Sequence, residues 1–187
     1  KGYGAYIKPD TLVPFQMHYH KEPGEGTGVW DQSEIALIFW PKGEEPQHSV
    51  EIEPLGAFDF YIPANSKYTH TTDFTFPMNA EILSFNPHMH LRGDYAKIEA
   101  FYPGGQNEIL LEVPKYDFNW QIDYVFDEPL ALPAGSSIHA VAHYDNSAAN
   151  RSNPDPTAAV RRGEQTDEEM CFTALSYLLA AAAEGDT

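Results

Sequence analysis

The sequence Phe85-Asn86-Pro87-His88-Met89-His90-Leu91-Arg92-Gly93 contains the pattern around which the rest of the chain is organised. Successive side chains of an extended backbone point to opposite sides, so His88 and His90 share one side of a strand. Two imidazoles that converge on one point supply half of a metal site. The stretch therefore predicts a β-strand, and its spacing alone fits two ligands for a transition metal as well as two ordinary strand histidines.

Strand-like segments continue on both sides of this stretch, and tight turns separate them at intervals of roughly 8–12 residues. The expected strands are Ser49–Ile52, Asp59–Ile62, Tyr68–Phe76, Ala80–Asn86, Ala96–Tyr102, Glu108–Val113, Trp120–Phe126, Ser137–Tyr144 and Glu168–Leu179. The chain also contains 15 Pro and 13 Gly, which favour such turns. This pattern predicts an all-β fold, an antiparallel β-sandwich of the jelly-roll type.

Residues 1–46 differ from the rest of the chain. Val13–His20 and Ile35–Trp40 are expected strands, and the second is a short apolar run typical of a buried strand. Pro41–Pro46 is polar and flanked by two prolines, as in a linker. We therefore expect residues 1–46 to supply the end strands of a neighbouring sandwich plus a linker, and residues 47–187 to form a second sandwich.

A third ligand for the predicted metal site is available late in the chain. Glu164, Thr166, Glu168 and Met170 alternate onto one face if this segment is extended. A zinc site would need a further His, Cys or carboxylate, whereas copper that cycles to Cu(I) also accepts a thioether. A methionine commonly fills gaps in a core, but the polar companions of Met170 favour a ligand.

The other histidines carry weaker predictions. His18 and His20 form a second His-x-His pair, for which a polar strand face and a metal site are equally good interpretations. His48, His70, His139 and His143 are scattered, and the last two, near the end of an expected strand, are interpreted as structural. The loop from Asp145 to Pro156 offers oxygen ligands for calcium, but hydrogen-bonded Asx-turns explain its composition equally well.

The charge of the chain excludes some classes of partner. Its 187 residues include 11 Lys+Arg and 28 Asp+Glu, a net charge of -17, which argues against nucleic acid and anionic membranes. No apolar run approaches the ~18 residues of a transmembrane segment, and Cys171 is the single cysteine. Because the chain starts at Lys1 without a signal peptide, we expect it to be a piece of something longer.

Four motifs in sequence order resemble those of a known family. They are Pro-His-Met-His-Leu (87–91), Asp-Phe-Asn-Trp-Gln (117–121), Tyr-Asp-Asn-Ser (144–147) and Gly-Glu-Gln-Thr (163–166), the last followed by Glu169-Met170. With them, the chain resembles the copper type II, ascorbate-dependent monooxygenases, in particular bacterial relatives. This family includes peptidylglycine α-hydroxylating monooxygenase and dopamine β-monooxygenase. Met17-His18-Tyr19 also looks like a strand late in the family's first domain.

The resemblance implies specific ligands. Family members have two β-sandwich domains with one copper each, and the second copper activates O₂ for C–H hydroxylation. Carried over, the ligands of the second copper are His88, His90 and Met170. The first copper relays electrons and is held by an adjacent His-His pair and a third histidine, of which only the third matches, at His18. The resemblance thus implies a missing upstream domain.

Departures from the family leave a second hypothesis open. Asn86 and Pro87 stand where the peptide-hydroxylating enzyme has an Arg for a substrate carboxylate, so a peptide carboxylate is not the expected substrate. With half of the two-copper arrangement missing, the chain also fits a non-catalytic structural or binding subunit that retains the fold. Either hypothesis implies a partner, the upstream domain or another protein subunit, and an extracytoplasmic location, periplasmic or secreted.

Overall fold

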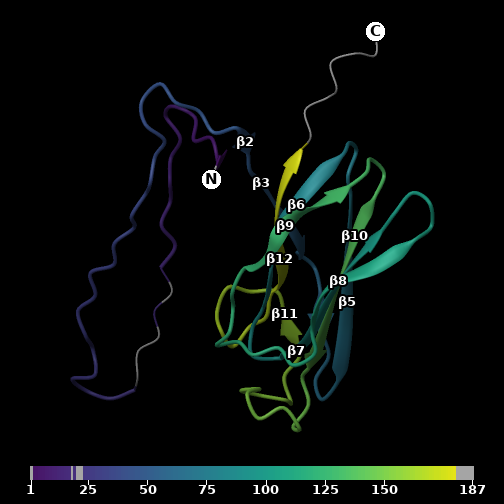
Figure 1. Cartoon of the computed structure of the whole chain (residues 1–187). Coiled ribbons are helices and arrows are strands. Elements are labelled where there is room, and N and C mark those ends of the chain that lie inside the picture. The colour runs from purple at the N-terminus through teal and green to yellow at the C-terminus, as the bar shows by residue number, and fades with distance from the viewer. Residues whose placement is uncertain (1, 18, 20–22, 180–187) are drawn as a thin grey trace. The chain divides into compact units, whose positions relative to one another are not determined.

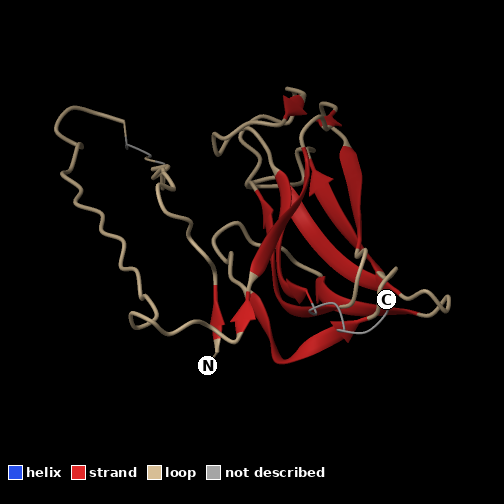
Figure 2. Ribbon diagram, turned by 90° about the horizontal axis from the view of Figure 1, so that it is seen from above, coloured by secondary structure: helices blue, strands red, loops and turns tan. Residues whose placement is uncertain are grey.

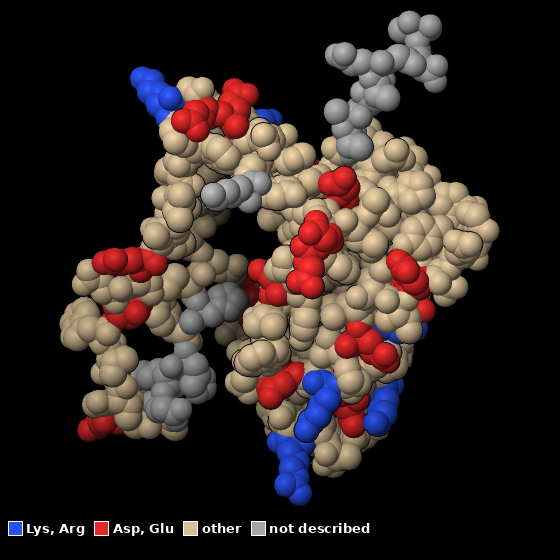
Figure 3. Space-filling view, viewed as in Figure 1, with Lys and Arg blue, Asp and Glu red and all other residues tan. Residues whose placement is uncertain are grey.

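The structure is a computed structural model that describes residues 2–17, 19 and 23–179. The chain divides into two compact units, Lys1–Ser49 and Val50–Thr187 (Figure 1). Across the residues that the structure describes, no helix has the length and apolar character needed to pass through a membrane. Acidic side chains are scattered over the face shown in Figure 3 rather than gathered in one patch.

The second unit is a sandwich of two four-stranded antiparallel sheets (Figures 1 and 2). Its strands are β3 (Glu51–Ala57), β5 (Lys67–Thr75), β6 (Ala80–Met89), β7 (Gly93–Phe101), β8 (Asn107–Val113), β9 (Tyr124–Leu132), β10 (Ser137–Asp145) and β12 (Cys171–Leu179). One sheet has the order β3-β12-β6-β9 and the other β5-β10-β7-β8. Counted along the chain, this is the strand order of a jelly roll, so the predicted fold class is confirmed.

Alternation of side chains explains the strands and the core. In β12, every second residue from Cys171 to Tyr177 is buried, and β5 alternates between exposed and half-buried positions. Phe85 and Leu175 from one sheet meet Ile98 and Ile138 from the other, and all four are at most 1% exposed. The inward-facing residues of both sheets therefore form one apolar core between them.

The segment before β12 corrects one prediction. Glu164–Met170 was expected to be extended, with its even-numbered residues on one face, but it is a turn-rich loop, and the strand begins only at Cys171. Its one fully buried side chain is Glu169, which the alternation places on the other face. The hydrogen bonds of Glu169, described below, determine the path of this loop. A short sheet of β4 (Tyr61–Ile62) and β11 (Val160–Arg161) lies earlier in the chain.

The first unit also differs from the expectation. Its described residues form two short parallel strands, β1 (Tyr3–Gly4) and β2 (His48–Ser49), and no other strand. Strands expected over Val13–His20 and Ile35–Trp40 are absent from the described residues there, and Ile38 is 99% exposed. A strand needs a neighbour to pair its backbone groups, and these segments have none within the unit. His18 and His20 lie outside the described residues.

Candidate metal centre

Strand β6 ends at the His-x-His pair and brings its two rings together. His88 lies on the strand and is half-buried, while His90 follows its last residue and is 4% exposed. The ring centres are 5.2 Å apart and the rings are nearly perpendicular, at 87°. Two imidazoles bound to one ion through metal–nitrogen bonds of ~2.0 Å have ring centres roughly 5 Å apart at a tetrahedral angle. The pair is therefore spaced as two ligands of one ion would be.

The register of β6 with β12 places Met170 beside this pair. Met89 pairs with Cys171 and His88 with Phe172, so one further step sets Met170 opposite His90. The carboxylate oxygen Oε1 of Glu169 accepts hydrogen bonds from the backbone N–H groups of both His90 and Met170, which confirms that the two backbones are adjacent. Met170 itself is half-buried. The structure thus places the backbone of Met170 next to that of His90.

Gln121 orients the ring of His88. Its amide oxygen Oε1 accepts a hydrogen bond from Nδ1 of His88, and its amide nitrogen donates to the carbonyl oxygen of Phe118 at 2.7 Å. An amide oxygen can only accept, so Nδ1 carries the proton and Nε2 carries the lone pair. Metal-binding histidines are commonly held by such an acceptor on the opposite ring nitrogen. Gln121 therefore presents Nε2 of His88 as the nitrogen for a metal.

The loop between β8 and β9 replaces a neighbouring strand at the end of β6. The β6–β9 ladder ends at Phe85 and Tyr124, before the histidines are reached. Beyond it, the Tyr116 hydroxyl donates to the carbonyl oxygen of Met89 at 2.7 Å and accepts from the Met89 N–H at 3.0 Å. Burial raises the pKa of Tyr116 to about 12, so its hydroxyl keeps its proton at neutral pH. Phe118 from the same loop packs edge-on against His90, with ring centres 5.9 Å apart.

Glu169 holds two backbone segments together, the one after β6 at His90 and Arg92 and the one before β12 at Met170. Besides its two bonds through Oε1, its Oε2 accepts from the Arg92 N–H at 3.0 Å, and the side chain is fully buried. Burial raises the pKa of Glu169 to about 7, against the lowering effect of the three backbone donors and the Arg92 guanidinium. The Glu169 carboxylate is thus the joint between the end of β6 and the start of β12.

Buried Arg92 connects this joint to two further motifs. Its Nε donates to the Asn146 side-chain oxygen at 2.9 Å, and one terminal nitrogen donates to the Asp167 carbonyl oxygen at 2.8 Å. The Asn146 amide in turn donates to the carbonyl oxygens of Pro63 and Ala158, both at 2.9 Å. Segments far apart in the sequence therefore form one hydrogen-bonded network around the histidines.

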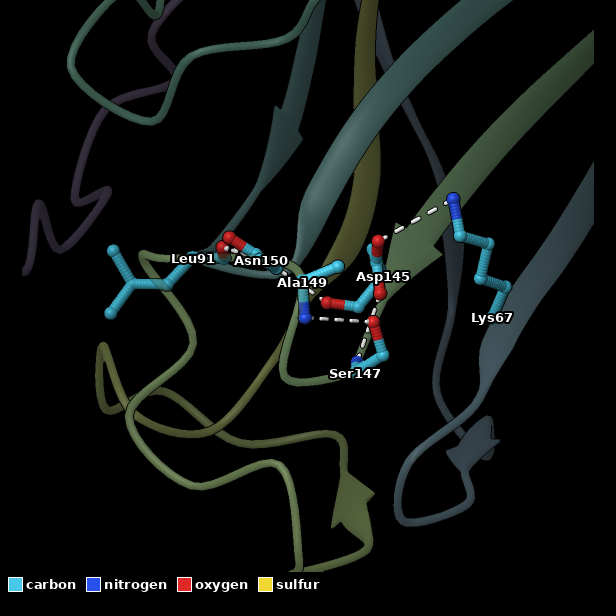
Figure 4. Close-up of polar contacts among 6 residues, drawn as sticks. All are labelled: Lys67, Leu91, Asp145, Ser147, Ala149 and Asn150. Carbon is cyan, nitrogen blue, oxygen red and sulfur yellow. Dashed lines mark hydrogen bonds and ion pairs between the residues drawn. The ribbon is translucent and has the colours of Figure 1, made fainter.

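Figure 4 shows the start of the loop that follows β10, at the same end of the sandwich. Asp145 lies 3.4 Å from the Lys67 ammonium and accepts from the Ser147 N–H at 2.9 Å. Asn150 donates to the carbonyl oxygens of Leu91 and Asp145, both at 3.0 Å, and so ties the loop to the turn after His90. These bonds give Asp145 and Asn150 hydrogen-bonding roles within the loop.

A pocket of about 420 Å³ opens beside His90. Tyr116 and Phe118 supply aromatic walls, and Asp94, Lys115 and Asp145 supply charged groups. Burial raises the pKa of Asp94. The pocket gives the His90 side of the site a space in the size range of small-molecule sites.

The remaining histidines of the sandwich lie apart from this centre. His139 bonds Asp73 on the neighbouring strand at 2.7 Å, His143 stacks on Tyr95 with ring centres 4.6 Å apart, and His70 contacts Tyr68. His48 belongs to the first unit. Within the described ranges, no group of three or more His, Cys, Asp or Glu residues is placed to hold a metal.

Sequence reasoning missed the supporting residues of the centre. Glu169 was read only as part of a motif, and Gln121 and Asn146 likewise. Arg92 was given no role of its own, although it is 2% exposed and its side chain carries the network. A charged residue two positions after the His-x-His pair, matched by an acidic residue before Met170, was the available signal, but only the fold shows that they meet.

Gly93 provides a test of how tightly the centre is packed. A Cβ at this position would lie 2.6 Å from Cβ and 2.9 Å from Sδ of Met89, the residue between the histidines. We expect Gly93→Ala to lower the free energy of unfolding by about 1–3 kcal/mol, since overpacking forces its neighbours to move. Gly104→Ala is the matched control, because no atom lies within 4 Å of its added Cβ. Urea unfolding of both variants measures the difference, and equal stabilities would contradict the close contact.

Comparisons with known proteins add little to this description. No protein-family model matches the sequence, and no curated protein matches it. The solved structures that match include the VP2 subviral particle of infectious bursal disease virus, at 10% identity and a TM-score of 0.28, and the Gt strain of that virus, at 10% identity and 0.27. Each match covers 80% of this chain, which spans 47% and 48% of those chains. Similarity at this level supports no conclusion about function.

Proposed function

We propose that this chain is the O₂-activating copper domain of a monooxygenase related to the copper type II, ascorbate-dependent enzymes. The observation that carries the proposal is the geometry at the end of β6. Two nearly perpendicular imidazoles lie 5.2 Å apart, and the backbone of Met170 lies next to that of His90. Two nitrogen donors with one thioether suit copper that cycles to Cu(I) better than zinc or magnesium.

The residues of the chain would divide the work as follows. His88, His90 and Met170 hold the ion, and Gln121 fixes the His88 ring. Glu169 holds the backbones of His90 and Met170 at one separation. When bound, copper supplies the one-electron chemistry with O₂ that C–H hydroxylation requires. The pocket beside His90 gives a substrate a place to approach the site.

The proposed reaction needs electrons from outside this sandwich. In the family, a second copper in an upstream domain supplies them, and His18 would be one of its ligands. We propose that this partner is the upstream domain or another protein subunit, in an extracytoplasmic compartment. Large apolar side chains in the first unit are exposed, among them Trp30 at 102% and Ile38 at 99%. Such exposure is typical of a surface that another protein covers.

The same observation favours a second candidate function. A chain whose first unit offers apolar side chains to a partner could be a non-catalytic subunit that retains the sandwich and has lost the metal. Copper binding separates the two candidates, because only the first requires it. A metal-free chain that takes up no copper at micromolar concentration would support the subunit function.

The test is a titration of the metal-free chain with Cu(I) against a competing chelator, and separately with Cu(II). We expect one copper per chain, bound more tightly in the reduced state. Met170→Ala should weaken Cu(I) binding much more than Cu(II) binding, because a thioether adds affinity mainly for the softer ion. Met78→Ala is the control, since Met78 is exposed and lies outside the strands. Equal Cu(I) affinities of the two variants would remove Met170 from the ligand set.

A further inference from the structure

A stack of aromatic side chains leads away from the proposed copper site through a second buried cluster, which includes Phe60, Ile62, Met89 and Tyr144. Tyr144 is fully buried, and its hydroxyl donates to the Met170 carbonyl oxygen at 2.9 Å. Its ring centre lies 6.2 Å from that of Tyr68 and 5.7 Å from that of Phe60. His70 continues the stack, with its ring centre 6.1 Å from that of Tyr68. The rings therefore connect a proposed ligand residue with strand β5.

The stack ends in a hydrogen-bonded tyrosine–histidine pair. The Tyr68 hydroxyl lies 3.1 Å from Nδ1 of His70, and both side chains are half-buried. Since a phenol is the stronger donor here, Nδ1 accepts, which requires the tautomer with its proton on Nε2. Burial lowers the pKa of His70, against a smaller raising effect of Asp59, so the ring is neutral and able to accept a proton. Burial also raises the pKa of Tyr68, so its hydroxyl stays protonated.

This arrangement matches the requirements for oxidising a tyrosine reversibly. Removal of one electron from a phenol makes its proton strongly acidic, so the electron leaves readily only where a base is in place to take the proton. Nδ1 of His70 is such a base, within hydrogen-bond distance. The closely packed rings of Tyr144 and Phe60 provide a path for the electron between Tyr68 and the end of the sandwich that holds Met170.

We propose that Tyr68 and His70 form a redox-active pair. Tyr68 supplies electrons to an oxidant at the end of the sandwich where His88 and His90 lie, and His70 takes up its proton. Tyr68 loses one electron to a one-electron oxidant. At the same time its O–H bond breaks and an N–H bond forms at Nδ1 of His70. The products are a neutral tyrosyl radical, an imidazolium and the oxidant reduced by one electron. A small-molecule one-electron reductant such as ascorbate restores the phenol, and the proton returns from His70.

The pair would protect the centre when oxidation occurs without a substrate. The inference rests on the proposed function in one respect only: the oxidant would be produced by copper chemistry at His88 and His90. The pair itself is a property of the metal-free sandwich. Its test can therefore fail or succeed independently of copper binding.

The first experiment oxidises the metal-free chain with flash-generated ruthenium(III) tris(bipyridine) and follows tyrosyl radicals by electron paramagnetic resonance. The chain has 11 Tyr, so the variants decide the assignment. We expect the longest-lived radical of the wild type to be lost in Tyr68→Phe and retained in Tyr95→Phe. Tyr95 is the matched control because it also stacks on a histidine, His143, but its hydroxyl donates to Glu112 at 2.9 Å.

The base is tested by His70→Asn, which keeps a polar side chain and removes the imidazole. We expect oxidation of Tyr68 to slow by about 100-fold, the lower range of what a positioned base contributes. The circular dichroism spectrum should stay that of the wild type, which separates this effect from loss of the fold. An unchanged radical in Tyr68→Phe, or an unchanged rate in a folded His70→Asn chain, would overturn the proposal.

A second experiment tests the link to the site. The copper-loaded chain is reduced with ascorbate, separated from the excess ascorbate, exposed to O₂ without substrate and frozen at intervals. We expect the same radical as in the flash experiment, absent from Tyr68→Phe and weakened in Tyr144→Leu, which interrupts the stack. A radical seen with ruthenium but never with copper would contradict the link to the site, and a chain that binds no copper would contradict the proposed function.

Discussion

Glu169→Ala is expected to lower the free energy of unfolding by about 3–5 kcal/mol, because it leaves three buried backbone N–H donors without an acceptor. The carboxylate accepts from the backbone N–H groups of His90, Arg92 and Met170, and it is fully buried. Alanine leaves all three donors without an acceptor in a place that water does not reach, and each such donor costs about 1–3 kcal/mol. It also removes the electrostatic attraction between the Glu169 carboxylate and the buried Arg92 guanidinium. Guanidinium chloride unfolding, followed by tryptophan fluorescence, measures the loss.

Two further variants make this expectation specific. Glu169→Gln keeps the shape and one acceptor oxygen, but turns an amide N–H group toward one of the donors, so its cost should be smaller, about 1–3 kcal/mol. Glu128→Ala removes an exposed carboxylate from β9 and should change the stability by less than about 0.5 kcal/mol. If Glu169→Ala were no more costly than Glu128→Ala, the carboxylate would not be the joint between β6 and β12.

His88→Ala and His90→Ala are expected to abolish tight copper binding. Each removes one of two fixed nitrogen donors, and the loss of affinity should exceed about 100-fold, the upper range for residues that only support a ligand. Both oxidation states should be affected, in contrast to Met170→Ala, because imidazole binds Cu(I) and Cu(II) alike. In the wild type, binding should fade as the pH falls through ~6.5, where imidazoles usually take up protons. Competition titrations with a copper chelator measure these effects.

Gln121→Ala and His139→Ala provide comparisons for the two histidine variants, with an intermediate loss of copper affinity expected for the first and none for the second. Without its amide acceptor, the His88 ring loses its fixed tautomer, so Gln121→Ala should weaken copper binding by about 10–100-fold without removing a ligand. His139 bonds Asp73 on the neighbouring strand β5, away from the centre, so His139→Ala should leave the affinity unchanged. Copper uptake that persists unchanged in His88→Ala would show that the metal binds elsewhere.

The location of the centre follows from where strand β6 stops pairing with its two neighbours, β9 and β12. At the end of β6, the β9 ladder has ended and β12 is only beginning, so the backbone around the histidines depends on side chains. The Tyr116 hydroxyl forms hydrogen bonds with both backbone groups of Met89. The Glu169 carboxylate accepts hydrogen bonds from the backbone N–H groups of His90, Arg92 and Met170. A site built this way is held more rigidly than its loops alone would allow, as a metal centre requires.

The amino-acid sequence by itself determined the sandwich and the His-x-His pair. Both depend on alternation along a strand, which is a local property: it specifies which residues point inward and places His88 and His90 on one side. Most predicted strand bounds in the sandwich fall within a few residues of those observed for the same reason. The strand expected over Ile35–Trp40 failed because its apolar residues satisfy the local pattern but find no strand to pair with in their unit.

Only the tertiary structure decided which side chains hold the centre. Met170 meets His90 because the β6–β12 register brings residues 80 positions apart in the sequence to adjacent places. The alternation rule predicted an extended Glu164–Met170, yet burial of Glu169 against three backbone donors replaced that strand with a loop. Gln121, Arg92 and Asn146 acquire their roles through the same long-range contacts. Such contacts depend on how the sheets and loops close in space, and no periodicity in the sequence encodes that closure.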